Sequence, residues 1–219
     1  VATELTRHIE VAGRLEVIGE GVAQAFQEPA SAYAVEAVRR RLRLPSRYLV
    51  SVGTLEPRKG LTTTIRALRH LPTDVELAVV GPTGWGDALG DIDPDLAARV
   101  RLLGRLSDDE LAAVVTGATA SVHASTSEGF GLPLVEAMSV GTPTVHTDIP
   151  VFLEVAGGAG LTFGIGEDAN LAAQVARLLD STQTAASARD AGLAVASHHR
   201  WEHAAQQLWD LYRGLAARR

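Results

Sequence analysis

A segment at residues 53–60 combines glycine with two adjacent cations, as expected of a turn that binds phosphate. It reads Gly-Thr-Leu-Glu-Pro-Arg-Lys-Gly and lies between a predicted strand and a predicted helix. Arg58 and Lys59 would stand beside the helix N-terminus, where unpaired N–H groups already favour an anion. Arginine matches two phosphate oxygens with its planar fork, whereas lysine acts as a point charge. The segment predicts a diphosphate site, and a surface turn with solvated basic residues is the alternative.

A second glycine-containing segment, residues 127–133, reads Ser-Glu-Gly-Phe-Gly-Leu-Pro and precedes another predicted helix. Pro133 suits the first helical position, because the N–H that proline lacks would have no partner there. Gly129 and Gly131 leave the backbone free to turn its amides toward a ligand. Ligands of open parallel sheets bind at the carboxyl ends of the strands, where both segments lie. The pair is therefore expected to hold one diphosphate from two sides.

Two glutamates accompany the second segment. Glu128 lies within it, and Glu136 is expected in the first turn of the helix that follows. A carboxylate in a first turn is often only a complement to the helix dipole. If phosphate occupies the helix start, however, Glu136 is placed to hold the hydroxyls of a ribose, and Glu128 faces the group to be transferred. A glycosidase pair of carboxylates is disfavoured, because it leaves the glycine-rich backbone unexplained.

The elements that position these residues alternate between strand and helix. Short apolar runs resemble strands buried on both faces, and their spacing from helical stretches is typical of βαβ units. We therefore expect an α/β fold, a Rossmann-like doubly wound parallel sheet. The predicted strands are Leu15–Ile18, Tyr48–Val52, Leu77–Val80, Val100–Leu102, Ala120–His123, Thr144–Thr147 and Leu161–Phe163. The predicted helices between them are Ala32–Leu42, Thr62–His70, Asp95–Arg99, Asp108–Thr116, Pro133–Val140 and Asn170–Leu179.

The chain divides into three parts by this pattern. Residues 1–30 are expected to be the tail of a preceding domain with its linker, residues 31–180 the ligand-binding domain, and residues 181–219 C-terminal helices. The last helix, Trp201–Leu215, carries an apolar face. That face either packs on its own domain or covers a partner domain, and the sequence leaves both interpretations open.

Composition excludes several classes of protein. The 219 residues carry 20 basic and 26 acidic side chains, and this net charge of -6 argues against a broad nucleic-acid surface. The absence of cysteine rules out disulfides and thiolate metal sites. No run approaches the roughly 18 apolar residues of a transmembrane helix. The N-terminal residues are too charged for a secretory signal, so we expect a cytoplasmic protein.

The two glycine-containing segments, taken with their continuation, resemble a known family. Residues 53–60 and the longer stretch Ser127–Met138 are similar to the two signature segments of the retaining family-4 glycosyltransferases. Further parts of that family are similar to Gly141–Val145 with the following Ile149-Pro150 and Glu154–Gly157, and to the predicted strand and turn Val17–Val22. The resemblance implies the C-terminal, nucleotide-sugar-binding half of a two-domain GT-B enzyme. The acceptor-binding N-terminal domain would then be missing from this sequence.

The resemblance also implies roles for individual residues. Lys59 and Arg58 would bind the diphosphate, Glu128 would contact the transferred sugar, and Glu136 would hold the ribose. Many members have arginine where this chain has Thr54, so Arg58 would supply that charge. The sequence of residues 53–59 resembles that of mannosyltransferases that use GDP-mannose as donor. A UDP-sugar donor stays open as the alternative. Further donor contacts are expected from Gly53, Thr54, Leu103, Gly129, Phe130, Gly131 and Leu132.

In such enzymes the leaving diphosphate assists the acceptor on the same face of the sugar, so no catalytic metal is expected. The acidic residues Asp87, Asp91, Asp93 and Asp95 lack the spacing of a calcium loop and are interpreted as solvated. Two other classes stay open. A dinucleotide-dependent oxidoreductase is disfavoured by the missing GxGxxG, and a non-catalytic module with this fold would bind no nucleotide.

Several histidines and one tryptophan also attract attention. His123 ends a predicted strand just before the second segment, so it either lines the pocket or is structural, and His146 has the same two interpretations. His198 and His199 are expected to be exposed. Trp85 would either anchor a loop or touch a base or acceptor.

Overall fold

The computed structural model describes residues 6, 9–10, 15–85 and 92–216. Within these ranges six strands form one parallel sheet of order β3-β2-β1-β4-β5-β6. From β1 the chain adds β2 and then β3 on one side. It then crosses back to add β4, β5 and β6 on the other side of β1. The order therefore reverses between β1 and β4, as in a doubly wound nucleotide-binding sheet. The prediction of a Rossmann-like α/β fold is confirmed.

The strands form where short apolar runs can be buried on both faces. β1 and β2 pair in register along their whole length, from Tyr48 opposite Glu76 to Val52 opposite Val80. Every residue of β4 and of β5 is buried, as expected of strands covered by helices on both faces. The strand bounds are β1 Tyr48–Val52, β2 Glu76–Val80, β3 Val100–Gly104, β4 Ala120–His123, β5 Thr144–Thr147 and β6 Leu161–Phe163.

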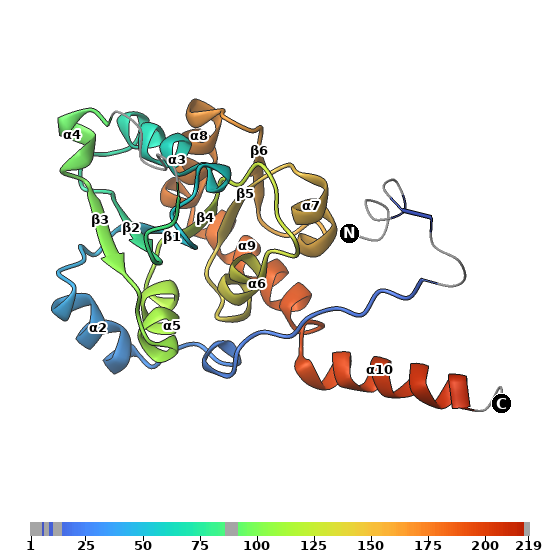
Figure 1. Cartoon of the computed structure of the whole chain (residues 1–219). Helices are drawn as coiled ribbons and strands as arrows, with labels where there is room; N and C mark the ends of the chain where they lie inside the picture. Colours follow the sequence, from blue (N-terminus) through green and yellow to red (C-terminus); the bar gives the residue numbers. More distant parts are fainter. Residues whose placement is uncertain (1–5, 7–8, 11–14, 86–91, 217–219) are drawn as a thin grey trace.

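Helices lie on both sides of this sheet (Figure 1). Helix starts are set by local chemistry, as in α5, where Ser107 and Glu110 form a reciprocal capping box. The helix bounds are α2 Ala32–Arg41, α3 Leu61–Ala67, α4 Pro94–Ala97, α5 Asp108–Thr116, α6 Leu132–Ser139, α7 Pro150–Ala156, α8 Asp168–Asp180, α9 Thr182–Ala196 and α10 Trp201–Ala216. Short 3-10 turns are η1 Gln24–Phe26, η2 Pro57–Lys59 and η3 Leu68–His70.

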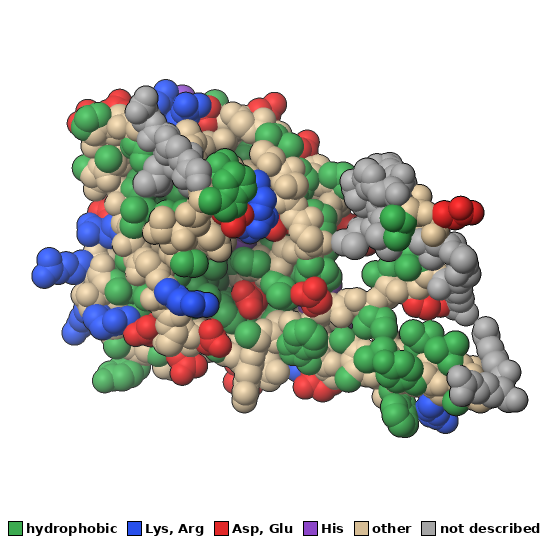
Figure 2. Space-filling model, viewed as in Figure 1, with side chains coloured by type: hydrophobic (Ala, Val, Ile, Leu, Met, Phe, Trp, Pro, Cys, Tyr) green, Lys and Arg blue, Asp and Glu red, His purple; other side chains and the backbone are tan. Residues whose placement is uncertain are grey.

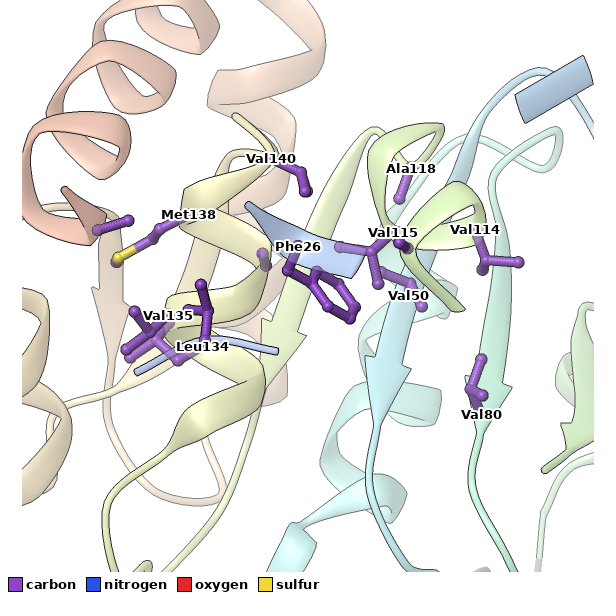
Figure 3. Close-up of a cluster of buried hydrophobic side chains, with 14 of the residues drawn as sticks. Phe26, Val50, Val80, Val114, Val115, Ala118, Leu134, Val135, Met138 and Val140 are labelled. Carbon is purple, nitrogen blue, oxygen red and sulfur yellow. The ribbon is translucent and has the colours of Figure 1, made fainter. Parts of the chain in front are cut away.

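Alternation along the strands divides the core into two layers. Val50 and Val80 point into one layer with α5 and α6, together with Phe26 of η1. Figure 3 shows this layer, where the ring of Phe26 lies between side chains of α5 and α6. Leu49 and Leu77 point into the other layer, against α3 and α8. The sheet is thus clamped from both sides, which fixes the positions of its carboxyl-edge loops.

Three expectations from sequence need correction. The strand predicted at Leu15–Ile18 is wrong, because this stretch has no strand assignment and two of its apolar side chains, Leu15 and Val17, are exposed. A strand needs a neighbour to satisfy its backbone groups, and this stretch pairs with none of the described strands. Helix α7 was not predicted, although proline in its first turn and a left-handed Gly157 at its end are regular boundary signals.

The third correction concerns α6. The helix begins at Leu132 rather than Pro133, with Gly131 as its N-cap in the left-handed region. Glu136 therefore lies beyond the first turn, which contains no acidic residue. This position argues against Glu136 acting simply as a complement to the helix dipole, because that effect is confined to the first turn.

The last helix departs from the body of the domain. α10 extends away from the sheet (Figure 1) and buries none of its residues. Figure 2 shows hydrophobic side chains gathered along it. Those exposed are Trp201, Leu208, Trp209, Tyr212 and Leu215. Of the two interpretations of this face, packing on its own domain is not what the structure shows.

Candidate functional site

The two glycine-containing segments meet at the switch point of the sheet. The first glycine loop, residues 53–60, follows β1, and the second, residues 127–133, follows β4, the strand beside β1. The backbone N–H of Thr126, the residue just before the second loop, donates to the carbonyl of Arg58 at 2.8 Å and so ties the start of the second loop to the first. A crevice at a switch point is where ligands of doubly wound sheets bind.

The first glycine loop owes its shape to two glycines. Gly53 has φ 147° and its N–H donates to the carbonyl of Val80. Gly60 has φ 63° and lies so close to Ala124 that an added Cβ would overlap the Ala124 carbonyl oxygen. The Lys59 side chain runs over Gly53, with its Cε 3.2 Å from where a Cβ of Gly53 would stand. Both glycines thus allow close backbone approaches that put Lys59 against β1 and β4.

Glu128 joins both cations of the first loop. Its Oε1 accepts from Lys59 Nζ at 2.6 Å and its Oε2 from Arg58 Nη1 at 3.1 Å. Ser125 Oγ also donates to Oε1 at 2.7 Å, and Arg58 Nε donates to Glu56 at 2.8 Å. Only 11% of the Glu128 side chain is exposed. Charge-assisted hydrogen bonds of this kind are among the strongest in proteins.

The electrostatics of Glu128 follow from these contacts. Burial by itself opposes ionisation of the carboxyl, but the hydrogen bonds from Lys59 and Ser125 and the charges of Lys59 and Arg58 outweigh it, so the pKa of Glu128 is lowered. The carboxylate is therefore ionised at neutral pH. It holds two cations side by side, one on each of its oxygens.

The second glycine loop supplies backbone rather than charge. Gly131 has φ 98°, and an added Cβ would stand 2.8 Å from Cε1 of Phe152. Gly129 has nothing within 4 Å of the equivalent position. α6 begins immediately afterwards, and the first N–H groups of a helix have no partners within it. This part of the loop can present backbone donors to an anion.

A pocket opens between the two loops and runs down to β4. Its floor includes His123 and Phe152, whose rings meet edge-on with centroids 6.1 Å apart. Burial lowers the pKa of His123 to about 3, and neighbouring His146 and Lys59 act in the same direction. His123 is thus neutral at physiological pH, and its Nε2 hydrogen-bonds Ser121 Oγ at 2.9 Å. Of the predicted site residues, those lining the pocket are Gly53, Thr54, Lys59, Glu128 and Gly131.

The remaining predicted residues do not line this pocket. Glu136 is half-buried, and its carboxylate accepts a hydrogen bond from the backbone of Ala23. Burial raises the pKa of Glu136, with Asp108 acting in the same direction. Leu103 is half-buried near the carboxyl end of β3 and packs on the core, whereas its neighbour Leu102 is exposed. Arg58, Gly129, Phe130 and Leu132 complete the two loops.

The other histidines differ from expectation in one case. His198 is exposed, as predicted, but His199 is half-buried and its ring meets that of Phe130. Sequence alone offered no signal for this contact, since His199 lies far along the chain from Phe130. His146 is fully buried and structural, with Nδ1 2.9 Å from the carbonyl of Thr147. Trp85 is 65% exposed.

The structure also bears on metals and membranes. Among the described residues, no group of three or more histidines and carboxylates is arranged to hold a metal ion. Asp87 and Asp91 lie outside those residues, and Asp93 caps α4 by accepting from the N–H of Asp95. Within the described parts of the chain, no helix is long and apolar enough to cross a membrane.

Comparison with curated proteins finds mannosyltransferases. The chain is 34% identical to the O-antigen chain mannosyltransferase B of Escherichia coli over 178 residues, which is 76% of this chain and 45% of that protein. It is 35% identical to a phosphatidyl-myo-inositol mannosyltransferase of Mycolicibacterium smegmatis over 135 residues, 58% of this chain and 34% of that protein. The chain thus matches about half or less of the length of these relatives.

Solved structures with a similar fold include two that are 25% identical to this chain. Anabaena Alr3699/HepE, crystallised with UDP and glucose, superposes with a TM-score of 0.80 and 25% identity over 90% of this chain and 56% of that one. The sucrose-phosphate synthase of Thermosynechococcus elongatus reaches 0.81 at 25% identity, covering all of this chain and 57% of that one. The sheet therefore matches one half of a GT-B glycosyltransferase.

A family model settles the relationship. The model described as "Glycosyl transferases group 1" matches residues 13–195, which include the whole sheet and both glycine loops. The chain belongs to the group 1 glycosyl transferases.

Proposed function

We propose that this chain is the donor-binding part of a retaining family-4 glycosyltransferase that transfers a hexose, most simply mannose, from a nucleoside diphosphate sugar. The observation that carries the proposal is the convergence of Arg58 and Lys59 on Glu128 at the switch point, beside the start of α6. A diphosphate needs two cations and backbone donors, and a sugar hydroxyl needs an acceptor. This crevice offers all three. The mannosyltransferase names of the relatives support the choice of sugar.

The proposed reaction assigns positioning and charge stabilisation to the protein. The bond between the anomeric carbon and the phosphate oxygen breaks while the acceptor oxygen bonds to the same face of the sugar. The acceptor proton passes to the leaving diphosphate. Arg58, Lys59 and the amides of Gly131 and Leu132 would stabilise the negative charge that develops on it. Glu128 would accept from the transferred sugar. No step requires a metal ion.

The nucleoside is assigned to the other side of the crevice. Glu136 faces the backbone of Ala23 and the charge of Asp108, which begins α5 just after β3. Its carboxylate has capacity for the ribose hydroxyls. Leu103 and its neighbours at the end of β3 would hold the base, guanine or uracil.

The isolated chain is proposed to bind donor without transferring it. Since the chain spans about half of its relatives' length, we assign acceptor binding to a further domain, to which residues 1–30 would lead. In the same proposal, the exposed apolar face of α10 packs against that further domain.

Isothermal titration with GDP, UDP, ADP and NADH tests the proposal, and is repeated with Glu136→Ala for the tightest nucleoside diphosphate. Saturable binding of one diphosphate, weakened about tenfold or more by the substitution, is expected; a lost pair of hydrogen bonds to a carboxylate is worth roughly 1.5–3 kcal/mol. Arg66→Met on the exposed face of α3 serves as a control that should bind normally. Binding of NADH instead would indicate an oxidoreductase, and binding of none of these would indicate a non-catalytic module.

A further inference from the structure

Phe130 is the large side chain between the two glycines of the second loop. It stands between Gly129 and Gly131, and an added Cβ at Gly129 would meet no atom within 4 Å. Glycine accepts many backbone conformations. The path of the loop is therefore set by its anchors, which are Glu128 on one side and the ring of Phe130 on the other.

The ring of Phe130 is anchored by His199. The two rings meet edge-on, with centroids 5.6 Å apart and an interplanar angle of 77°. Edge-to-face contact is a favoured geometry for aromatic pairs and adds to the stabilisation from burial. Phe130 also packs at the margin of the core layer that contains α6. His199 is thus one of the two contacts that hold the ring of Phe130.

His199 is itself held from several directions. Its ring lies against the backbone of Glu20 and of Val155, which lies in α7, and donates its one N–H there. Its main-chain carbonyl accepts from the N–H of Val22 at 3.1 Å, and its own N–H donates to Ala196 in α9 at 2.9 Å. Such a side chain is a fixed support rather than a surface group.

The segment that contacts His199 is packed closely. Gly21 lies against Arg200 and Trp201 with no room for a Cβ. The junction of α9 and α10, the stretch before η1 and the second glycine loop are therefore in mutual contact through one residue, His199. Burial lowers the pKa of His199, so the ring is uncharged at neutral pH and acts through its shape and hydrogen bonds.

We propose that His199 is a positioning residue for donor binding, which fixes Phe130 and so orients the backbone amides of Gly131 and Leu132 toward the diphosphate. This rests on the proposed function. Donors that are already oriented cost less to bind a ligand, because the loop has less freedom to lose. His199 touches no substrate in this scheme and acts only through Phe130.

Three substitutions separate positioning from mere stability. His199→Ala removes the ring, His199→Phe keeps an aromatic ring but loses the polar contact with the backbone of Glu20 and Val155, and His198→Ala alters the exposed neighbour as a control. Two measurements are made on each, namely amide hydrogen exchange of the peptide covering residues 126–134 and the Kd for the nucleoside diphosphate that binds wild type most tightly.

His199→Ala should speed exchange in that peptide and raise Kd about 3- to 10-fold, the range that corresponds to one aromatic contact. His199→Phe should restore both to within about twofold of wild type even if its Tm falls. Normal exchange and Kd in His199→Ala would overturn the proposal, as would a His199→Phe variant no better than His199→Ala. If wild type binds no diphosphate, the proposed function fails, while the exchange data still decide whether His199 holds the loop.

Discussion

The two glycine loops lie side by side at one edge of the sheet, yet their glycines meet different demands. In the first loop, Gly60 is left-handed and presses on the carbonyl of Ala124. In the second, Gly129 is exposed and faces open space. The first loop also brings its cations to a fixed place, whereas the second brings backbone. A glycine in a binding motif is therefore not by itself a sign of ligand contact, since some are required simply to fold the motif.

The largest effect is expected from Gly60→Ala. The left-handed backbone costs a residue with a Cβ about 1–2 kcal/mol, and overlap with Ala124 adds about 1–3 kcal/mol. Tm should fall by roughly 5–15 °C in a chain of this size, measured by thermal unfolding. Gly129→Ala is the matched comparison. A Gly60→Ala variant that melts within a degree or two of wild type would show that the loop relaxes freely and would remove the distinction.

Lys59→Met tests the charge carried by the first loop. The substitution keeps most of the side chain's length but removes the cation that contacts Glu128. We expect the Kd for a nucleoside diphosphate to rise about 10- to 100-fold, since a charged hydrogen bond contributes roughly 1.5–3 kcal/mol. Calorimetric titration measures it, with Arg66→Met as the control cation. Equal affinity in Lys59→Met and wild type would mean that the diphosphate binds at another part of the chain.

Glu128→Gln tests the ionic link between the loops through its pH dependence. Because the pKa of Glu128 is lowered in the folded chain, its ionised form stabilises the fold above the ordinary carboxyl pKa. That stabilisation is lost as pH falls through the lowered pKa. Glu128→Gln should therefore be less stable than wild type by about 1–2 kcal/mol at pH 7, with the difference shrinking under acid.

Denaturant unfolding at pH 7 and at progressively lower pH, as far as the fold persists, measures this difference. A gap between wild type and variant that widened under acid would contradict the ionic link. So would a Glu128→Gln variant as stable as wild type at neutral pH.

Sequence predicted the sheet well because its strands are short apolar runs with helices between them. β1, β4, β5 and β6 have the bounds expected, and in β4 and β5 burial of every residue leaves little freedom in where the strand begins and ends. Leu15–Ile18 has the same β-branched character but no neighbouring strand, and pairing is a property of the whole fold. Periodicity could not reveal that.

The site was predictable in part for the same reason. Two loops after adjacent strands must lie together, so the meeting of residues 53–60 with residues 127–133 follows from topology. The contacts of Glu128 with Arg58 and Lys59, and of Phe130 with His199, depend on side-chain direction across about 70 residues in each case. No local pattern encodes these contacts.

Glu136→Gln should have a smaller effect on stability, and of the opposite sign to Glu128→Gln. Burial raises the pKa of Glu136, so the folded state favours the protonated form and its charge is a cost above that pKa. Stability from this group is thus gained as pH falls. The variant should be equal to wild type or more stable by less than about 1 kcal/mol at pH 8, and any gain should be smaller at pH 5. Thermal unfolding at both pH values measures this, and a marked loss of stability at pH 8 would contradict it.

The smallest stability effect is expected at Gly129, and it completes the comparison between the loops. An added Cβ meets nothing within 4 Å there, and the residue's φ lies outside the left-handed region. Gly129→Ala should thus change the free energy of unfolding by no more than about 0.5 kcal/mol. If this glycine is kept open for a ligand, the same variant should weaken diphosphate binding measured by calorimetry while melting like wild type. A large loss of stability would show that Gly129, like Gly60, is needed to fold its loop. Normal stability with normal binding would show that glycine is needed at position 129 neither for folding nor for the ligand.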